Sequence, residues 1–462
     1  MGEFVGITPG PANALRGRMT KATSQANSIR GRLAADIAAA AGDWTGGTGA
    51  EALSRTASFL TTAERDLNWR ITTITHAPGV KWDHGMATAQ FAFADLAAAE
   101  AAGRAKGGEL AKLWAQYKQD PTLANYNRFL AAMKVGEGDP GYDAGLLKGL
   151  GADNYRAIFE EWMKLKKDPT GHGVNPAELK QLIHDLGPLA RALAVADVPD
   201  LRRNLLKKGS PDVISALLVM TPQSKEFVVE AGKYLAGAVT NHTTDPNWNL
   251  RWLYTALDQN PVAFQAVLAS SLETANRLLS PTVLGEGDIR DLTTRAITKA
   301  MNEGLNDPTR RQAIANIAGS FSPGIDRNPQ LRAALVAALT RELDNQPTRR
   351  DFFQKLVRSL AAAGKPAPAL REKDINQLFA RHLVSFLPEI SGLEATRNDP
   401  NLKMDPGDGW SLVSHDDLVN VINGVIIDPD GYKTLRNGLY RFQSTLDKGT
   451  GDINDPKQRD LV

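Results

Sequence analysis

Seven histidines are the residues that could support acid–base or metal chemistry in this 462-residue chain. They form no His-x-x-x-His pair and no Glu-x-x-His pair, the spacings by which one helix face presents ligands to zinc or iron. His415 beside Asp416 and Asp417 could act as an acid–base group, but the polarity of a helix start explains it equally well. The chain has no cysteine, which excludes disulfides, thiolate metal sites and cysteine nucleophiles. No Gly-x-Ser-x-Gly elbow occurs, so we expect no enzymatic activity and no cofactor or metal.

One glycine-rich stretch has the letters of a nucleotide-binding motif. Gly136-x-Gly138-x-x-Gly141 matches the dinucleotide fingerprint, which must follow a strand and open a helix. Here the preceding residues have the pattern of a helix end, and Pro140 removes an amide donor. We interpret this stretch as a domain-boundary loop.

A second stretch resembles the front of a calcium-binding EF-hand loop. It runs from Asp168 to Gly173, but Leu179 stands at the twelfth position, where a bidentate carboxylate is required. A turn that precedes a helix start at Asn175-Pro176 explains it better.

The composition excludes some classes of partner. Lys plus Arg (54) nearly balance Asp plus Glu (52), so no net field favours nucleic acid or an anionic membrane. No run of 18 apolar residues is present, so we expect no membrane span. Met1 to Gly6 lacks the pattern of a secretory signal. One local cluster of cations, which we interpret as a solvated helix face, comprises Arg16, Arg18, Lys21, Arg30 and Arg32.

Two long amphipathic patterns begin the chain. Apolar residues recur every three or four positions over residues 13–41 and again over 48–75, as one face of a helix requires. The short connection, in which Gly46 permits positive φ and Trp44 can pin the helix ends, predicts an antiparallel helical hairpin over residues 1–78.

Trp44-Thr45-Gly46, at the centre of an N-terminal hairpin, resembles the Trp-X-Gly family of type VII secretion substrates, small helical hairpins exported by actinobacteria and some Firmicutes. Members or their partners usually carry a Tyr-x-x-x-Asp/Glu export signal after the second helix, and this chain has none there. Phe91 to Asp95 is the nearest aromatic variant. Tyr254 to Asp258 fits the letters but lies mid-chain, where it indicates a helical packing pair.

The apolar stripe of this hairpin is the candidate binding surface. Two helices alone cannot bury it, so it should pack on a second hairpin as in a four-helix bundle. That second hairpin comes either from another molecule or from residues 86–134 of this chain. Besides Trp44 and Gly46, the residues that we expect to serve pairing are Leu33, Ile37, Leu60 and Leu67.

The remainder predicts an all-α protein in which an irregular multi-helix array follows the hairpin. Residues 79–135 form a helical connector that we expect to pack on or near the hairpin, with Met86 to about Ala105 helical. Residues 136–462 form one helical region or two subdomains. Many of their helices should begin at an Asp, Asn, Ser or Thr followed by Pro, because the polar side chain caps the helix and Pro suits its first position. These marks show no fixed repeat period.

These patterns favour a non-enzymatic, secretion-associated helical protein: a substrate, a carrier or the N-terminal part of an effector of a type VII-like system. The resemblance implies pairing with a small helical hairpin protein or with a second copy, contact with secretion machinery, and a cytoplasmic protein that is then secreted or displayed at the cell surface. The alternative is a cytoplasmic helical scaffold or adaptor, and a helical toxin or hydrolase ranks behind both.

Overall fold

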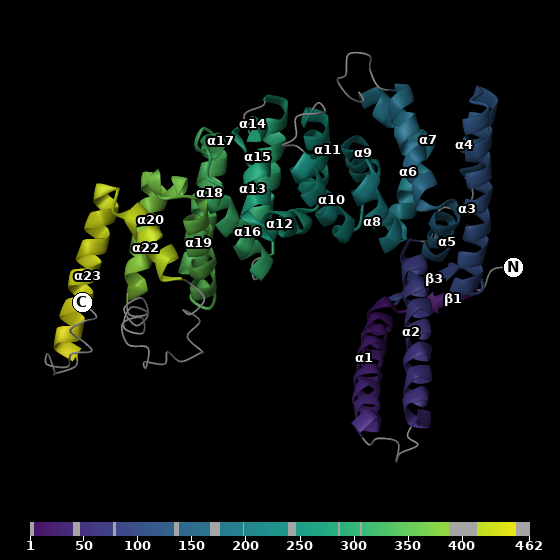
Figure 1. Ribbon diagram of the computed structural model, residues 1–462, viewed down its shortest axis with the longest axis horizontal. Helices are drawn as coiled ribbons and strands as arrows, with labels where there is room; N and C mark the ends of the chain where they lie inside the picture. Colours follow the sequence, from purple (N-terminus) through teal and green to yellow (C-terminus); the bar gives the residue numbers. More distant parts are fainter. Residues whose placement is uncertain are drawn as a thin grey trace. The chain divides into compact units, whose positions relative to one another are not determined.

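The computed structural model describes residues 4–39, 47–76, 80–133, 138–166, 176–196, 198–238, 246–284, 287–304, 307–387 and 414–449 (Figure 1). The chain divides into two compact units, Met1–Ser224 and Lys225–Val462. Helices dominate both units, which confirms the all-α class.

The first unit combines nine described helices with three short strands. The strands are β1 (Phe4–Ile7), β2 (Lys81–Asp83) and β3 (Met86–Gln90). The helices are α1 (Pro9–Ala39), α2 (Gly47–His76), α3 (Leu96–Gln119), α4 (Leu123–Met133), α5 (Pro140–Leu150), α6 (Ala152–Lys166), α7 (Pro176–Val195), α8 (Pro199–Lys208) and α9 (Pro211–Met220).

The small sheet corrects the expectation of helix from Met86 onward. Residues Met86–Gln90 are a strand, and α3 begins only at Leu96. The strand β3 lies between β1 and β2 and is antiparallel to both. His84 and Gly85 both have positive φ, as the tight two-residue turn of a β-hairpin requires. The alternation of buried Ala87 and Ala89 with more exposed neighbours places one face of β3 on the core.

The helices α1 and α2 are antiparallel neighbours (Figure 1). Arg16, near the start of α1, donates to the side-chain oxygen of Asn68 near the end of α2. Further along, the Arg30 guanidinium donates to the Ser54 hydroxyl at 3.3 Å. In Figure 1 the pair extends away from α3 and α5, and it is the C-terminal end of α2 that joins the rest of the unit.

Close packing of α3 on α5 forms the base of this unit. A Cβ placed on Gly103 would lie 1.9 Å from the Tyr142 carbonyl oxygen, and one on Gly107 would lie 2.1 Å from that of Leu146. On the facing helix, a Cβ on Gly145 would lie 2.1 Å from the Glu100 oxygen. The two backbones therefore touch directly, which only glycine at these positions allows.

The second unit contains helices throughout its described residues. They are α10 (Lys225–Ala238), α11 (Pro246–Gln259), α12 (Pro261–Ser270), α13 (Leu272–Leu278), α14 (Pro281–Leu284), α15 (Gly287–Asn302), α16 (Pro308–Gly319), α17 (Pro323–Asp326), α18 (Pro329–Asp344), α19 (Arg349–Ala363), the 3-10 helix η2 (Pro368–Arg371), α20 (Lys373–Ser385), α22 (His415–Val425) and α23 (Pro429–Gly449).

These helices have a regular order that the Xaa-Pro spacing does not reveal. One row runs through α11, α15, α18, α20 and α23, and a second through α12, α16, α19 and α22, with each helix packed on the next in its row. The helices α11, α15, α18 and α20 begin at 246, 287, 329 and 373, which are steps of 41, 42 and 44 residues. This is the arrangement of an α-solenoid, in which each helical pair is buried by its neighbours.

Several predicted helix starts are confirmed by their capping hydrogen bonds. The side chains of Asp139, Ser210, Asn260, Asp307 and Asn328 each accept from a backbone N–H in the first turn of the helix that Pro then opens. The sequence therefore determines these boundaries locally.

Candidate partner-binding face

The apolar stripe that the sequence predicts lies along the α1–α2 pair. Leu33, Ile37, Leu60 and Leu67 are each half-buried, so none is enclosed by the two helices. Ala26 is the one residue of α1 that counts as fully buried. The pair thus leaves all four predicted residues partly exposed.

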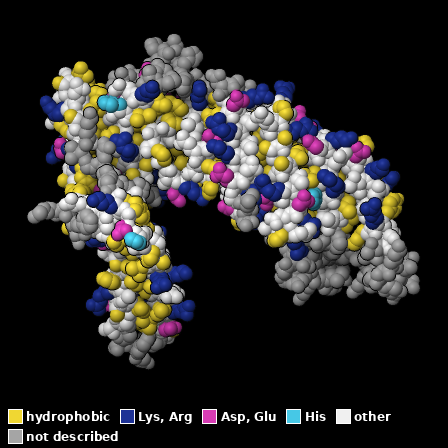
Figure 2. Space-filling view, turned by 180° about the vertical axis from the view of Figure 1, so that it is seen from behind, with side chains coloured by type: hydrophobic (Ala, Val, Ile, Leu, Met, Phe, Trp, Pro, Cys, Tyr) yellow, Lys and Arg dark blue, Asp and Glu magenta, His cyan; other side chains and the backbone are white. Residues whose placement is uncertain are grey.

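Three larger apolar side chains are more exposed still. Leu15 and Ile29 on α1 are 51% and 52% exposed, and Phe59 on α2 is 70% exposed. Isolated exposed side chains of this kind are ordinary, but here they continue the half-buried stripe. Figure 2 shows hydrophobic side chains along the length of this pair, with Lys and Arg at its edges. Helical periodicity includes Leu15 and Ile29 in the stripe, whereas it does not single out Phe59.

The base of the pair is fixed by the last turns of α2. The Trp69 ring meets Phe91 edge-on at 5.3 Å between centroids, in a cluster with Ile74 and the buried face of β3. The indole N–H donates to Asp139 Oδ1 at 2.9 Å, and the same oxygen caps α5. Residues 86–134 therefore hold the end of α2, while the stretch that includes Leu33 and Ile37 has no such cover among the described residues.

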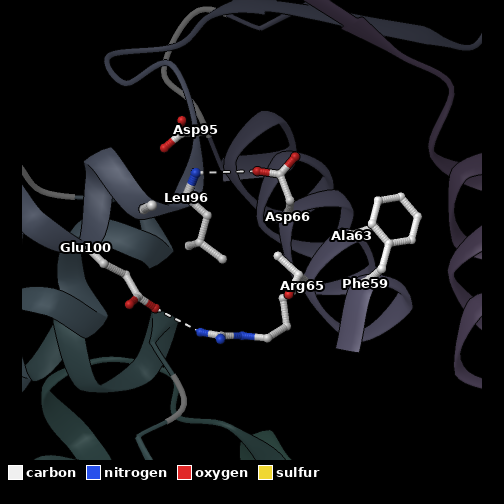
Figure 3. Close-up of a pocket in the computed structure, with 9 residues that line it drawn as sticks. Phe59, Ala63, Arg65, Asp66, Asp95, Leu96 and Glu100 are labelled. Carbon is white, nitrogen blue, oxygen red and sulfur yellow. Dashed lines mark hydrogen bonds and ion pairs between the residues drawn. The ribbon is translucent and has the colours of Figure 1, made fainter. Parts of the chain in front are cut away.

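A pocket of about 410 Å³ lies where α2 meets the start of α3 (Figure 3). Leu96 points into it, and Phe59 and Ala63 contribute apolar surface from α2. Arg65 pairs with Glu100 at 3.0 Å across one side. The pocket thus adjoins the exposed stripe and offers room for an apolar side chain beside an ion pair.

The polar groups around this face are structural. Asp66 pairs with Arg70 at 2.8 Å and accepts from the Leu96 N–H at 3.4 Å, which fixes the start of α3. Burial raises the pKa of Tyr142, which stacks on Phe93, so its phenol stays neutral at physiological pH.

Two of the predicted pairing residues, Trp44 and Gly46, lie outside the described residues, as does the loop that resembles an EF-hand. Within the glycine-rich stretch, the Asp139 carboxylate caps α5, which begins at Pro140. The two aromatic segments that were compared with export signals each contain a buried aromatic side chain. Phe91 is buried against Trp69, and the hydroxyl of the buried Tyr254 donates to the Leu278 carbonyl at 2.7 Å.

Within the described ranges, no cluster of three His, Asp or Glu side chains could hold a metal ion. In the same part of the chain, no helix is both long and apolar enough to cross a membrane. Comparison of the chain with protein-family models, with curated proteins and with solved structures found no match.

Proposed function

We propose that this protein acts by helix–helix pairing through the α1–α2 stripe, as a substrate, carrier or effector portion of a type VII-like export system. Its partner on this reading is another helical hairpin. The observation that carries the pairing is the stripe itself: four half-buried leucine or isoleucine side chains, continued by the exposed Leu15, Ile29 and Phe59.

The alternative, in which residues 86–134 of the same chain cover the stripe, has less support. The part of the chain proposed to cover the stripe, residues 86–134, packs on the end of α2 near Trp69 and on α5. An apolar stripe that stays partly exposed along two helices of 31 and 30 residues is the kind of surface that marks a protein-binding site. A second hairpin would bury it as in a four-helix bundle.

The pairing is tested by measuring the molar mass of the full chain in solution. The measurement is made on the chain alone and on the chain co-expressed with any small hairpin protein encoded beside it. Size-exclusion chromatography with light scattering should show a complex. Ile29→Asp should abolish it without loss of helicity, because this side chain is already half exposed. Ser24→Asp is the matched control, since it adds the same charge to the same helix at another exposed position. A monomer that recruits no partner would contradict the proposal.

Export is tested separately from pairing. The amount of protein in the medium of the producing cells should fall when the secretion ATPase of the type VII-like system is deleted. An unchanged amount, or complete retention in both strains, would remove the export part of the proposal and leave the pairing part standing.

A cytoplasmic scaffold is the second candidate function, and the two-row array of the second unit favours it. Solenoids of helical pairs present extended surfaces that commonly bind other proteins. If the protein is a scaffold, the two-row array of the second unit binds the partner, and deletion of α1 and α2 should leave partner binding unchanged.

A further inference from the structure

We propose that the partner of the α1 seam is a helix with acidic flanking positions and not a second copy of this chain. This inference rests on the proposed pairing and adds the chemistry of the partner. It reinterprets the basic cluster of α1, which the sequence alone presents as a solvated face.

The apolar side chains of α1 follow a heptad. Leu15, Ala22 and Ile29 recur at intervals of seven, and so do Met19, Ala26 and Leu33. These two series are the a and d positions of a coiled-coil seam. Only Ala26 of the six is buried, while Leu15 and Ile29 are half exposed, so α2 covers part of the seam and leaves the Leu15 and Ile29 series open.

The cations of α1 fall on opposite flanks of this seam. Arg16 and Arg30, on one flank, bond to α2: Arg16 to Asn68 and Glu64, and Arg30 to Ser54. Arg18 and Arg32 lie on the other flank, fourteen residues apart, and both are exposed. Residues on these flanks meet the flanks of the facing helix in a coiled coil and decide which partner is accepted.

The carboxylates of α2 already have arginine partners within the pair, so they do not neutralise these outer cations. The acids of α2 are Glu51, Glu64 and Asp66, and each lies within ion-pair distance of an arginine of the pair: Arg55, Arg16 and Arg70, respectively. On α1, Asp36 is the single acid against five cations. Arg18, Lys21 and Arg32 have no ion pair with any described residue. A second copy would therefore oppose cations to cations, which disfavours the homodimer.

The test uses two synthetic helical peptides of about four heptads. Both carry the same Leu and Ile seam, and they differ only in having Glu or Lys at the flanking positions. Binding to the full-length protein is measured by fluorescence anisotropy. We expect the Glu peptide to bind at least about tenfold more tightly, because several weak charge pairs add up, and the preference should shrink at high salt.

Charge reversal on the protein should reverse the preference. The double variant Arg18→Glu with Arg32→Glu should bind the Lys peptide more tightly than the Glu peptide. The matched control, Lys112→Glu with Lys207→Glu, changes the net charge of the same unit equally at exposed lysines outside α1 and α2. It should keep the original preference, so a reversal in the control would overturn the proposal.

The other possible binding results distinguish failure of the acidic preference from failure of the proposed pairing. Equal binding of both peptides overturns the acidic preference and leaves the proposed pairing intact. If neither peptide binds and the chain stays monomeric, the proposed function fails and the inference fails with it. A stable homodimer that the Glu peptide cannot dissociate identifies a second copy as the occupant and overturns the inference alone.

Discussion

The indole N–H of Trp69 donates to Asp139 Oδ1 at 2.9 Å, across 70 positions of sequence. The same oxygen accepts from the backbone N–H groups of Gly141 and Tyr142 at 2.9 and 3.0 Å. One carboxylate oxygen therefore caps α5 and holds the end of α2. This bond therefore ties the C-terminal end of α2 to the start of α5.

Trp69→Phe should destabilise the first unit by about 1–3 kcal/mol, because it removes the donor to Asp139 and part of a buried ring. Urea unfolding followed by circular dichroism measures the loss. Asp139→Ala should cost more, since it also removes the cap of α5. Equal stability of Trp69→Phe and the wild type would show that the bond contributes nothing.

Gly103→Ala should lower the thermal midpoint markedly, because the new Cβ would lie 1.9 Å from the Tyr142 carbonyl oxygen and must push α3 from α5. Gly108→Ala is the matched control on the same helix, where nothing lies within 4 Å of the added Cβ. It should raise stability by up to about 1 kcal/mol through helix propensity. Scanning fluorimetry distinguishes the two. Similar midpoints for both variants would contradict the close packing.

Removing one partner of the buried Arg310–Glu342 pair should lower the stability strongly, whereas replacing both partners by apolar residues should lower it little. Both side chains are 1% exposed, and the Arg310 guanidinium also donates to the Met301 carbonyl at 3.0 Å. Glu342→Gln leaves the cation without its carboxylate and should cost about 3–5 kcal/mol in chemical unfolding. Arg310→Met with Glu342→Leu should recover most of that loss. A double variant as unstable as the single would contradict this account.

Stability of the second unit should fall below about pH 6.5, partly through His382. Burial lowers the pKa of this imidazole, and Asp344 at 3.4 Å opposes the shift only in part. The unfolded chain therefore binds the proton first. The contribution of His382 to the free energy of unfolding is fully present above 6.5, its pKa in the unfolded chain. It is lost as the pH falls toward the lower pKa of the folded state. His382→Gln should flatten the change in thermal midpoint between pH 7.5 and 5.5, and an unchanged slope would exclude this group.

The sequence by itself determined the helical class and many helix boundaries. Each confirmed cap joins residues two or three apart, as Asn260 does with Ala263, so its energetics are contained in one turn. The apolar period likewise identified α1 and α2, because one face of a helix must repeat every three to four residues. The sequence does not distinguish strand β3 from a helix, because its inward side chains, Ala87 and Ala89, are small residues that suit a helix equally well.

Only the tertiary structure decided which surfaces meet. Gly103 and Gly107 are spaced as a close-packing motif, yet nothing local says that α5 is the helix they admit. Periodicity places Leu15 and Ala26 on one stripe, but the packing of α2 buries Ala26 and leaves Leu15 half exposed. Likewise, the two rows of the second unit depend on contacts between helices about 40 residues apart. Such choices are made by the burial of one element against another, which no window of sequence contains.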